Sequence, residues 1–210
     1  MKQTEHIRVL CTDDHRIVRE GIALIINRQP DMEVVASAAS GEEALGLFRA
    51  QRPDVTLMDL QLAGMSGLET IRAIRRVQAT ARIVVLTMYQ GDEDIYRALK
   101  AGAAAYLLKD SLSDDLIRVI REVHAGKSSA NAAVEARLAA RASRPTLTPR
   151  EIQVLELIAE GMRNRDIGRV LGVTEETVDV HVKNIRAKLD VNDRTAAINV
   201  AIKRGIIHIQ

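Results

Sequence analysis

The stretch PDVTLMDLQLAG, residues 53–64, leads a buried strand pattern directly into an acidic residue. Its apolar run, Val55 to Met58, is continuous rather than alternating, which is typical of a strand covered on both faces. The run stops at Asp59, and an aspartate at such a point is often only a turn or cap residue. Whether Asp59 has a chemical role therefore depends on what the rest of the chain brings to the same place.

Four other apolar runs alternate with segments of helical period. Together the runs predict strands at 7–11, 33–37, 54–58, 82–87 and 104–108. Helices are predicted near 15–27, 41–50, 67–76, 92–101 and 113–124. Two pairs, Ser40 with Glu43 and Ser66 with Glu69, have the spacing of helix capping boxes. The repeated βα units predict a doubly wound parallel sheet of the flavodoxin-like (βα)5 kind, with strand order 2-1-3-4-5.

The pattern changes after residue 124, and strand signals end. Residues 125–142 are rich in Ala, Ser and Arg and are predicted to form a linker with a helical middle. An all-α region of four helices is predicted over 143–208. Its helices begin at the capping box TPRE (148–151), at 164, at 175 and near 194. A short helix joined through Gly172 to a longer one is helix-turn-helix geometry, whose second helix enters the DNA major groove.

Composition excludes several classes of protein. The chain is 47 % apolar and 28 % charged, an ordinary globular balance, and only 2 % aromatic, which argues against single-strand binding by stacked rings. No signal peptide or membrane span is evident, so a cytoplasmic protein without membrane partners is expected. Cys11, the only cysteine, excludes an internal disulfide and is predicted to be buried. Residues 141–210 hold 12 basic and 9 acidic side chains, so a nucleic-acid surface is expected there.

Polar residues follow four of the five predicted strands. They are Asp13 and Asp14 after the first, Asp59 after the third, Thr87 at the end of the fourth, and Lys109 after the fifth. All lie at carboxyl ends of parallel strands, the rim where open α/β sheets bind ligands. Three carboxylates at one place repel unless a cation lies among them, and hard oxygen ligands favour Mg²⁺. The lysine and threonine suit a phosphoryl oxygen.

The chain resembles a response-regulator receiver domain over about residues 7–124. The resemblance lies in the segments CTDDH (11–15), VTLMD (55–59), VVLTM (84–88) and GAAAYLLKD (102–110). The resemblance implies that Asp59 accepts a phosphoryl group from a sensor histidine kinase. It also implies that Mg²⁺ is held by Asp13, Asp14, Asp59 and the backbone carbonyl of Gln61. Thr87 would move toward the phosphate, and Tyr106 would change rotamer with it.

Three positions depart from the receiver pattern. Ala63 stands where a proline is usual, so a more mobile loop is expected after Asp59. Met88 follows Thr87 where receivers often have Ala or Gly, and its bulk would restrict access to Asp59. Gln61 lies where side chains influence the water that removes the phosphoryl group. The last two positions bear on phosphoryl lifetime and not on which residue is the acceptor.

The segment LTPREIQVLELIAEGMRNRDIGRVLGVTEETVDVHVKNIRAKLDV (147–191) resembles the LuxR-type helix-turn-helix, over about 143–208. Joined to a receiver, it identifies the chain as similar to the NarL/FixJ-type two-component response regulators. The resemblance implies that Val180 and Lys183 enter the groove, that Thr177 and Asn184 lie near the DNA backbone, and that helix 194–204 mediates dimerisation.

The expected partners are therefore double-stranded DNA with two half-sites, a second copy of the phosphorylated chain, and the kinase, with RNA polymerase as a further candidate.

Asp179 departs from the family pattern, because relatives often have Lys or Arg at its position. A carboxylate there is repelled by phosphates, yet it could accept a hydrogen bond from a cytosine amino group. A specificity or intramolecular role is expected for it.

Two other functions compete with a transcriptional regulator. A Mg²⁺-dependent aspartyl-phosphate phosphotransfer enzyme is one, but such phosphatases resemble D-x-D-x-T, and here Gln61 occupies the second position after Asp59. The other is a receiver that acts by protein contact without phosphorylation; such receivers usually lose an acidic residue or the lysine, and this chain keeps them. A sensor of acyl-homoserine lactone is excluded, because the N-terminal half is the wrong domain. A regulator that is not an enzyme is expected.

Overall fold

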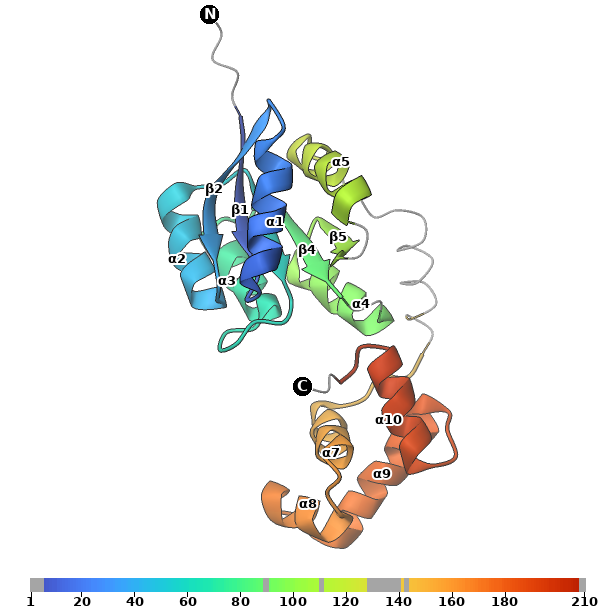
Figure 1. Cartoon of the computed structure of the whole chain (residues 1–210). Helices are drawn as coiled ribbons and strands as arrows, with labels where there is room; N and C mark the ends of the chain where they lie inside the picture. The colour runs from blue at the N-terminus through green and yellow to red at the C-terminus, as the bar shows by residue number, and fades with distance from the viewer. Residues whose placement is uncertain (1–5, 89–90, 110–111, 128–140, 142–143, 208–210) are drawn as a thin grey trace, which may run out of the picture. The chain divides into compact units, whose positions relative to one another are not determined.

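A parallel sheet organises the N-terminal part of the protein. The computed structural model describes residues 6–88, 91–109, 112–127, 141 and 144–207, which cluster into two compact units. The strands of the first unit are β1 (Ile7–Thr12), β2 (Met32–Ala38), β3 (Val55–Asp59), β4 (Ile83–Thr87) and β5 (Ala105–Leu108). They are parallel in the order β2-β1-β3-β4-β5 (Figure 1). The sequence prediction of a doubly wound sheet is confirmed.

Helices cover both faces of this sheet, which explains the continuous apolar strand sequences. They are α1 (Arg16–Asn27), α2 (Gly41–Gln51), α3 (Gly67–Val77), α4 (Asp92–Ala101) and α5 (Leu112–His124). Alternate strand residues such as Val84 and Leu86 pack with α1 and α5 in one core. Their neighbours Ile83 and Val85 pack with α2, α3 and α4 in another. Each strand is therefore buried on two sides, and polar side chains gather at its ends.

The capping sequences mark the helix starts, with one difference from prediction. Ser66 and Glu69 form a complete capping box at α3. At α2 the Ser40 side chain accepts from the Glu43 N–H, but the Glu43 carboxylate accepts from the N–H of Ala39 and not from that of Ser40. The predicted box at Ser40 is thus half formed, because the carboxylate reaches one residue further back.

The third strand begins and ends one residue later than predicted, at 55–59 instead of 54–58. Asp59 is the last residue of β3 and lies opposite Leu86 of β4. The expected break before the aspartate was wrong, because the ladder continues through its backbone while its side chain points out at the rim. The acidic residue is therefore held with the rigidity of the sheet.

The loop between β3 and α3 makes close backbone contacts although it has Ala63 where receivers usually have a proline. Gly67 donates its N–H to the Leu60 carbonyl, and a Cβ at position 67 would lie 2.0 Å from the Asp59 carbonyl oxygen. Further along, the Met65 N–H donates to the Glu42 carboxylate of α2 at 2.9 Å. These contacts anchor the loop at two points.

The second unit contains α7 (Pro149–Ala159), α8 (Asn164–Leu171), α9 (Glu175–Leu189) and α10 (Arg194–Lys203). Thr148 and Glu151 form the predicted capping box with Pro149 at the first turn of α7. Gly172, with φ of 67°, ends α8 as predicted. Gly168 lies inside α8, where a Cβ would approach the Val173 carbonyl to 2.8 Å, so the glycine lets the turn pack against the helix.

One apolar core joins these helices. Val178, Ile185 and Leu189 of α9 are buried in it together with residues of α7, α8 and α10. His181, one helical turn after Val178 on the same helix, is only half-buried. Most of the predicted linker, 125–142, lies outside the described residues. Within the part of the chain that the structure describes, no helix has the length and apolar character needed to cross a membrane.

Candidate functional site

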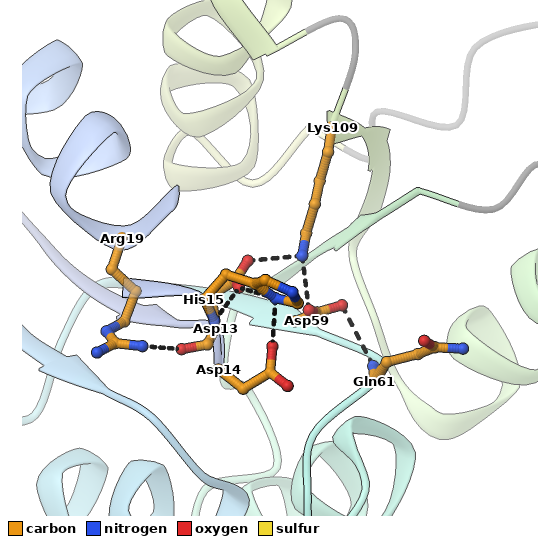
Figure 2. A network of polar contacts seen from close by, with 7 residues as sticks. All are labelled: Asp13, Asp14, His15, Arg19, Asp59, Gln61 and Lys109. Atoms are coloured by element: carbon orange, nitrogen blue, oxygen red, sulfur yellow. Dashed lines mark hydrogen bonds and ion pairs between the residues drawn. The ribbon is translucent and has the colours of Figure 1, made fainter. Parts of the chain in front are cut away.

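Strand register brings the acidic residues of the first unit together. Thr12 of β1 lies opposite Met58 of β3, so the next residues along the two strands, Asp13 and Asp59, are neighbours at the rim. Ligand atoms of Asp13, Asp14, His15 and Asp59 all lie within 4.8 Å of one another. We refer to Asp13, Asp14, Asp59 and Lys109 as the acidic pocket (Figure 2).

Lys109 is the cation of this pocket. It follows β5, and its side chain reaches across the rim with only 8 % of its surface exposed. Its Nζ lies 2.6 Å from an oxygen of Asp13 and 2.6 Å from an oxygen of Asp59 (Figure 2). Since both carboxylates are buried, the ammonium offsets much of the cost of removing them from water.

Burial and charge act in opposite directions on these groups. Burial raises the pKa of Asp59 above its usual value, and the hydrogen bond and charge of Lys109 only partly oppose that rise. For Lys109, burial alone would lower the pKa, but the hydrogen bonds to Asp13 and Asp59 outweigh it and raise the pKa. The lysine is therefore firmly protonated, and the pocket is poised to hold further positive charge.

Two residues that the sequence reading missed complete the pocket. The His15 imidazole lies 2.6 Å from Asp14, and the His15 backbone N–H donates to Asp13 at 2.9 Å. The Arg19 guanidinium of α1 donates to the Asp13 carbonyl (Figure 2). Their positions directly after the acidic pair and one turn into the following helix were the available signal.

The remaining predicted residues of this unit lie at the same rim or on the strands that lead to it. The Gln61 N–H donates to Asp59 at 3.2 Å, and its side chain points away from the lysine (Figure 2). Thr87 is the buried last residue of β4, opposite Leu108. Tyr106, in the middle of β5, is half-buried against the core shared with α2, α3 and α4. Met88 is 69 % exposed.

The donor set fits a divalent cation. Its side chains are carboxylates, which are hard oxygen donors of the kind that Mg²⁺ prefers. Three carboxylates lie with the Lys109 ammonium in the acidic pocket, and the Arg19 guanidinium adds a second positive charge at its edge; the negative charge that remains would favour a divalent cation. Asp14 is the most exposed of the three acids and leaves a side open to solvent.

The second unit presents an exposed polar face on α9. All four predicted DNA contacts, Thr177, Val180, Lys183 and Asn184, are exposed, and Val180 shows 56 % of its surface although it is apolar. The Thr177 hydroxyl lies 3.1 Å from that of Thr174, the residue that caps the helix. The opposite side of α9 forms the core, so the helix is fixed by one face and free on the other.

Each of the two units matches a known protein family. Residues 9–121 match the family described as response regulator receiver domain, and residues 145–201 match the bacterial regulatory proteins of the luxR family. The chain belongs to the NarL-type response regulators.

Two similar response regulators match nearly the whole chain. The transcriptional regulatory protein LiaR of Bacillus subtilis is 39 % identical over 96 % of this chain and 100 % of its own. The nitrate/nitrite response regulator protein NarL of Escherichia coli K12 is 40 % identical over 94 % and 95 %. This response regulator is therefore a transcriptional regulator and not an enzyme, and the phosphotransfer-enzyme alternative is set aside.

A solved structure extends the likeness. RcsB from Salmonella enterica serovar Typhimurium, bound to promoter DNA in the presence of the phosphomimetic BeF3-, matches with a TM-score of 0.68 and 25 % identity. The match covers 93 % of this response regulator and 98 % of that chain.

Proposed function

We propose that a sensor histidine kinase phosphorylates Asp59 in the presence of Mg²⁺, and that the phosphorylated chain binds promoter DNA as a dimer. The observation that carries this proposal is the acidic pocket itself. One buried lysine lies 2.6 Å from each of two buried carboxylates, beside a third acid and an open side. A structural ion pair would need neither the third carboxylate nor the exposed rim.

The chemistry follows from the groups present. A carboxylate oxygen of Asp59 attacks the phosphorus atom of the phosphohistidine; the P–O bond forms as the P–N bond breaks, and the kinase imidazole leaves. Lys109 stabilises negative charge that develops on the phosphoryl oxygens. A magnesium ion held by Asp13, Asp14, Asp59 and the Gln61 carbonyl would neutralise further charge on the same oxygens. The rigid end of β3 keeps Asp59 oriented throughout.

Phosphorylation changes the forces at the rim. It adds roughly −1.5 to −2 charges at pH 7 and three acceptor oxygens. Lys109, which contacts Asp13 and Asp59 in the unphosphorylated protein, gains the phosphoryl group as a stronger partner. The Thr87 hydroxyl can donate to the same phosphoryl group. Movement of Thr87 would give Tyr106 room to turn. A shift from 1:99 to 99:1 between two states needs about 5.5 kcal/mol, which several charge-assisted bonds supply.

The output is DNA binding by α9. Val180 and Lys183 would meet base edges, and Thr177 and Asn184 would lie near phosphates. A two-half-site operator needs two such helices about one DNA turn apart, so the phosphorylated chain dimerises, with α10 as the proposed contact. In this proposal the receiver spans residues 7–124, the linker 125–142 and the DNA-binding domain 143–208, and the protein acts in the cytoplasm.

Labelling with a small acyl phosphate tests the acceptor. Wild-type protein should be labelled in the presence of Mg²⁺, and chelation of the ion should abolish the label. Asp59→Asn should not be labelled, whereas the control Asp115→Asn, at a partly exposed surface acid paired with Arg118, should behave as wild type. Label on the Asp59→Asn variant contradicts the assignment, and no label on wild type favours a receiver that acts without phosphorylation.

Beryllofluoride, which mimics the phosphoryl group, tests the output. Treated protein should sediment as a dimer and bind a two-half-site operator more tightly than untreated protein. Thr87→Ala should weaken both responses while leaving Asp59 labelling largely intact. Unchanged mass together with unchanged affinity would rule out the switch.

A further inference from the structure

An acidic residue lies on the surface of α9 that is proposed to meet DNA. Asp179 is exposed and is followed by exposed Val180, with Lys183 one helical turn later. DNA phosphates repel a carboxylate, so Asp179 weakens nonspecific binding. Its position is explained only if the carboxylate does something that a lysine or alanine could not do.

The structure holds this carboxylate in one orientation. The Asn164 side-chain amide, at the start of α8, donates to Asp179 Oδ1 at 2.6 Å. The oxygen of the same amide accepts from the Arg194 guanidinium of α10 at 3.1 Å. Arg194 also donates to the Met162 carbonyl. Three helices are tied by one chain of bonds that ends on Asp179.

The two partners also fix which way the amide faces. A carboxylate can only accept and a guanidinium can only donate, so the NH₂ group of Asn164 must face Asp179 and its oxygen must face Arg194. Among the described residues, Asp179 Oδ2 has no hydrogen-bond partner. One oxygen is thus anchored, and the other remains available on the exposed face.

We propose that Asp179 reads a cytosine in each operator half-site and that Asn164 is the positioning residue that aims it. The inference rests on the proposed DNA-binding function of α9. An ionised carboxylate is acceptor-only, and cytosine presents an amino donor in the major groove. Guanine presents acceptors there, thymine a carbonyl and a methyl group, and adenine places an acceptor beside its amino group. Cytosine is therefore the base that fits Oδ2 without repulsion.

Anchoring makes this reading selective. A free aspartate could rotate away from a wrong base, whereas one oxygen fixed by Asn164 leaves the other repelled by any acceptor opposite it. Operators with cytosine at this position should bind about tenfold more tightly than operators with another base, which lies in the low to middle part of the usual affinity loss for one mismatched base pair. The carboxylate thus gives up general affinity and gains discrimination at one position.

Selection of bound DNA from a random-sequence pool by the full-length, beryllofluoride-treated protein tests the proposal. Wild type should select cytosine at one position in each half-site. Asp179→Ala should lose the preference at that position and keep it elsewhere. Asp179→Asn should reverse the preference toward guanine, which presents two acceptors in the major groove, because the new amide keeps its oxygen on Asn164 and turns its NH₂ group to the base; a misfolded protein could not produce that reversal. Asn164→Ala should reduce the cytosine preference in part.

A matched control separates charge from reading. Glu175→Gln removes a nearby exposed acid from the same helix. It should strengthen binding to all sequences by a similar factor, with no change in preference. If wild type selects a sequence and Asp179→Ala retains every preference, the inference is overturned while the proposed function stands. If the wild-type protein is folded but binds no DNA sequence above background, the proposed function fails, and the inference fails with it.

Discussion

The charged residues of the two proposed sites of this response regulator differ in burial. In the receiver, Lys109 is 8 % exposed and its partners Asp13 and Asp59 are buried, so the charges are part of the folded core. On α9, Lys183 and Asp179 are exposed, and the core lies on the other side of the helix. The difference teaches that the charges of the proposed phosphoryl site contribute to the stability of the fold, whereas the Lys183 charge on the proposed DNA-reading face does not.

Replacing a lysine by alanine should therefore lower the stability of the receiver but leave the stability of the DNA-binding part nearly unchanged. Lys109→Ala leaves two buried carboxylates without their cation, and we expect the receiver to lose about 3 kcal/mol of unfolding free energy without Mg²⁺. Added Mg²⁺ should restore part of the loss, because it binds the folded acids. Denaturant unfolding with and without the ion measures both effects. Unchanged stability in the variant would show that the buried pairs are not coupled to the fold.

Lys183→Ala is the matched change on α9. We expect its unfolding free energy to stay within about 0.5 kcal/mol of wild type, because the side chain is exposed. Binding to the selected operator should weaken by about 1–3 kcal/mol with relaxed specificity if the lysine reads a base. If it contacts only phosphate, all sequences should weaken alike and the salt slope should fall by about one. No loss on any sequence would mean that α9 does not face the groove.

A buried charge in the DNA-binding part sharpens the comparison further. Glu151 is 3 % exposed, and its carboxylate lies 2.7 Å from Lys188 of α9. Burial raises its pKa, but the bonds to Lys188 and Thr148 outweigh this, so the folded pKa lies below the usual value of 4.5. The ionised form therefore stabilises the fold above about pH 4.5, and that stability is lost as the pH falls through the folded pKa.

Glu151→Gln should thus lower stability at pH 7 by about 1.5 kcal/mol, and the difference from wild type should shrink at acidic pH. Hydrogen exchange of the α7 and α9 amides in the full chain measures it. DNA preference should not change, since this ion pair supports the core and not the exposed face. A difference that grows on acidification would contradict the direction of the pKa shift.

The smallest effect, no modification at all, is expected when the native protein meets thiol reagents that could react with Cys11, two residues before Asp13. The thiol is fully buried, and burial together with the Asp13 charge raises its pKa to about 12. Thiol reagents should leave the native protein unmodified at pH 8 and modify one cysteine per chain after denaturation. Mass spectrometry gives the count. Rapid native labelling would show that the rim opens far more deeply than the structure indicates.

The two parts also differ in how much the sequence predicts. The continuous apolar runs that lead to Asp59 and Thr87 indicate buried parallel strands, and the ends of parallel strands meet at one rim, so the sequence alone predicts that the residues of the acidic pocket lie together. The partners of Asp179 could not. Asn164 lies fifteen residues away on another helix and Arg194 on a third, and no local pattern encodes a side-chain bond across a turn. Likewise, Arg19 and His15 are ordinary residues of a helix start until the structure shows what they contact.

Gly67, the glycine beside the proposed acceptor Asp59, has a consequence for how this protein can change by mutation. Any side chain at position 67 would collide with the backbone of Asp59, so every amino acid other than glycine would displace the main chain that carries the Asp59 carboxylate. In a library of all single substitutions selected for signalling, variants at Gly67 should disappear as completely as variants at Asp59. One of these residues carries the carboxylate that is proposed to react and the other carries no side chain at all, yet selection would not distinguish them.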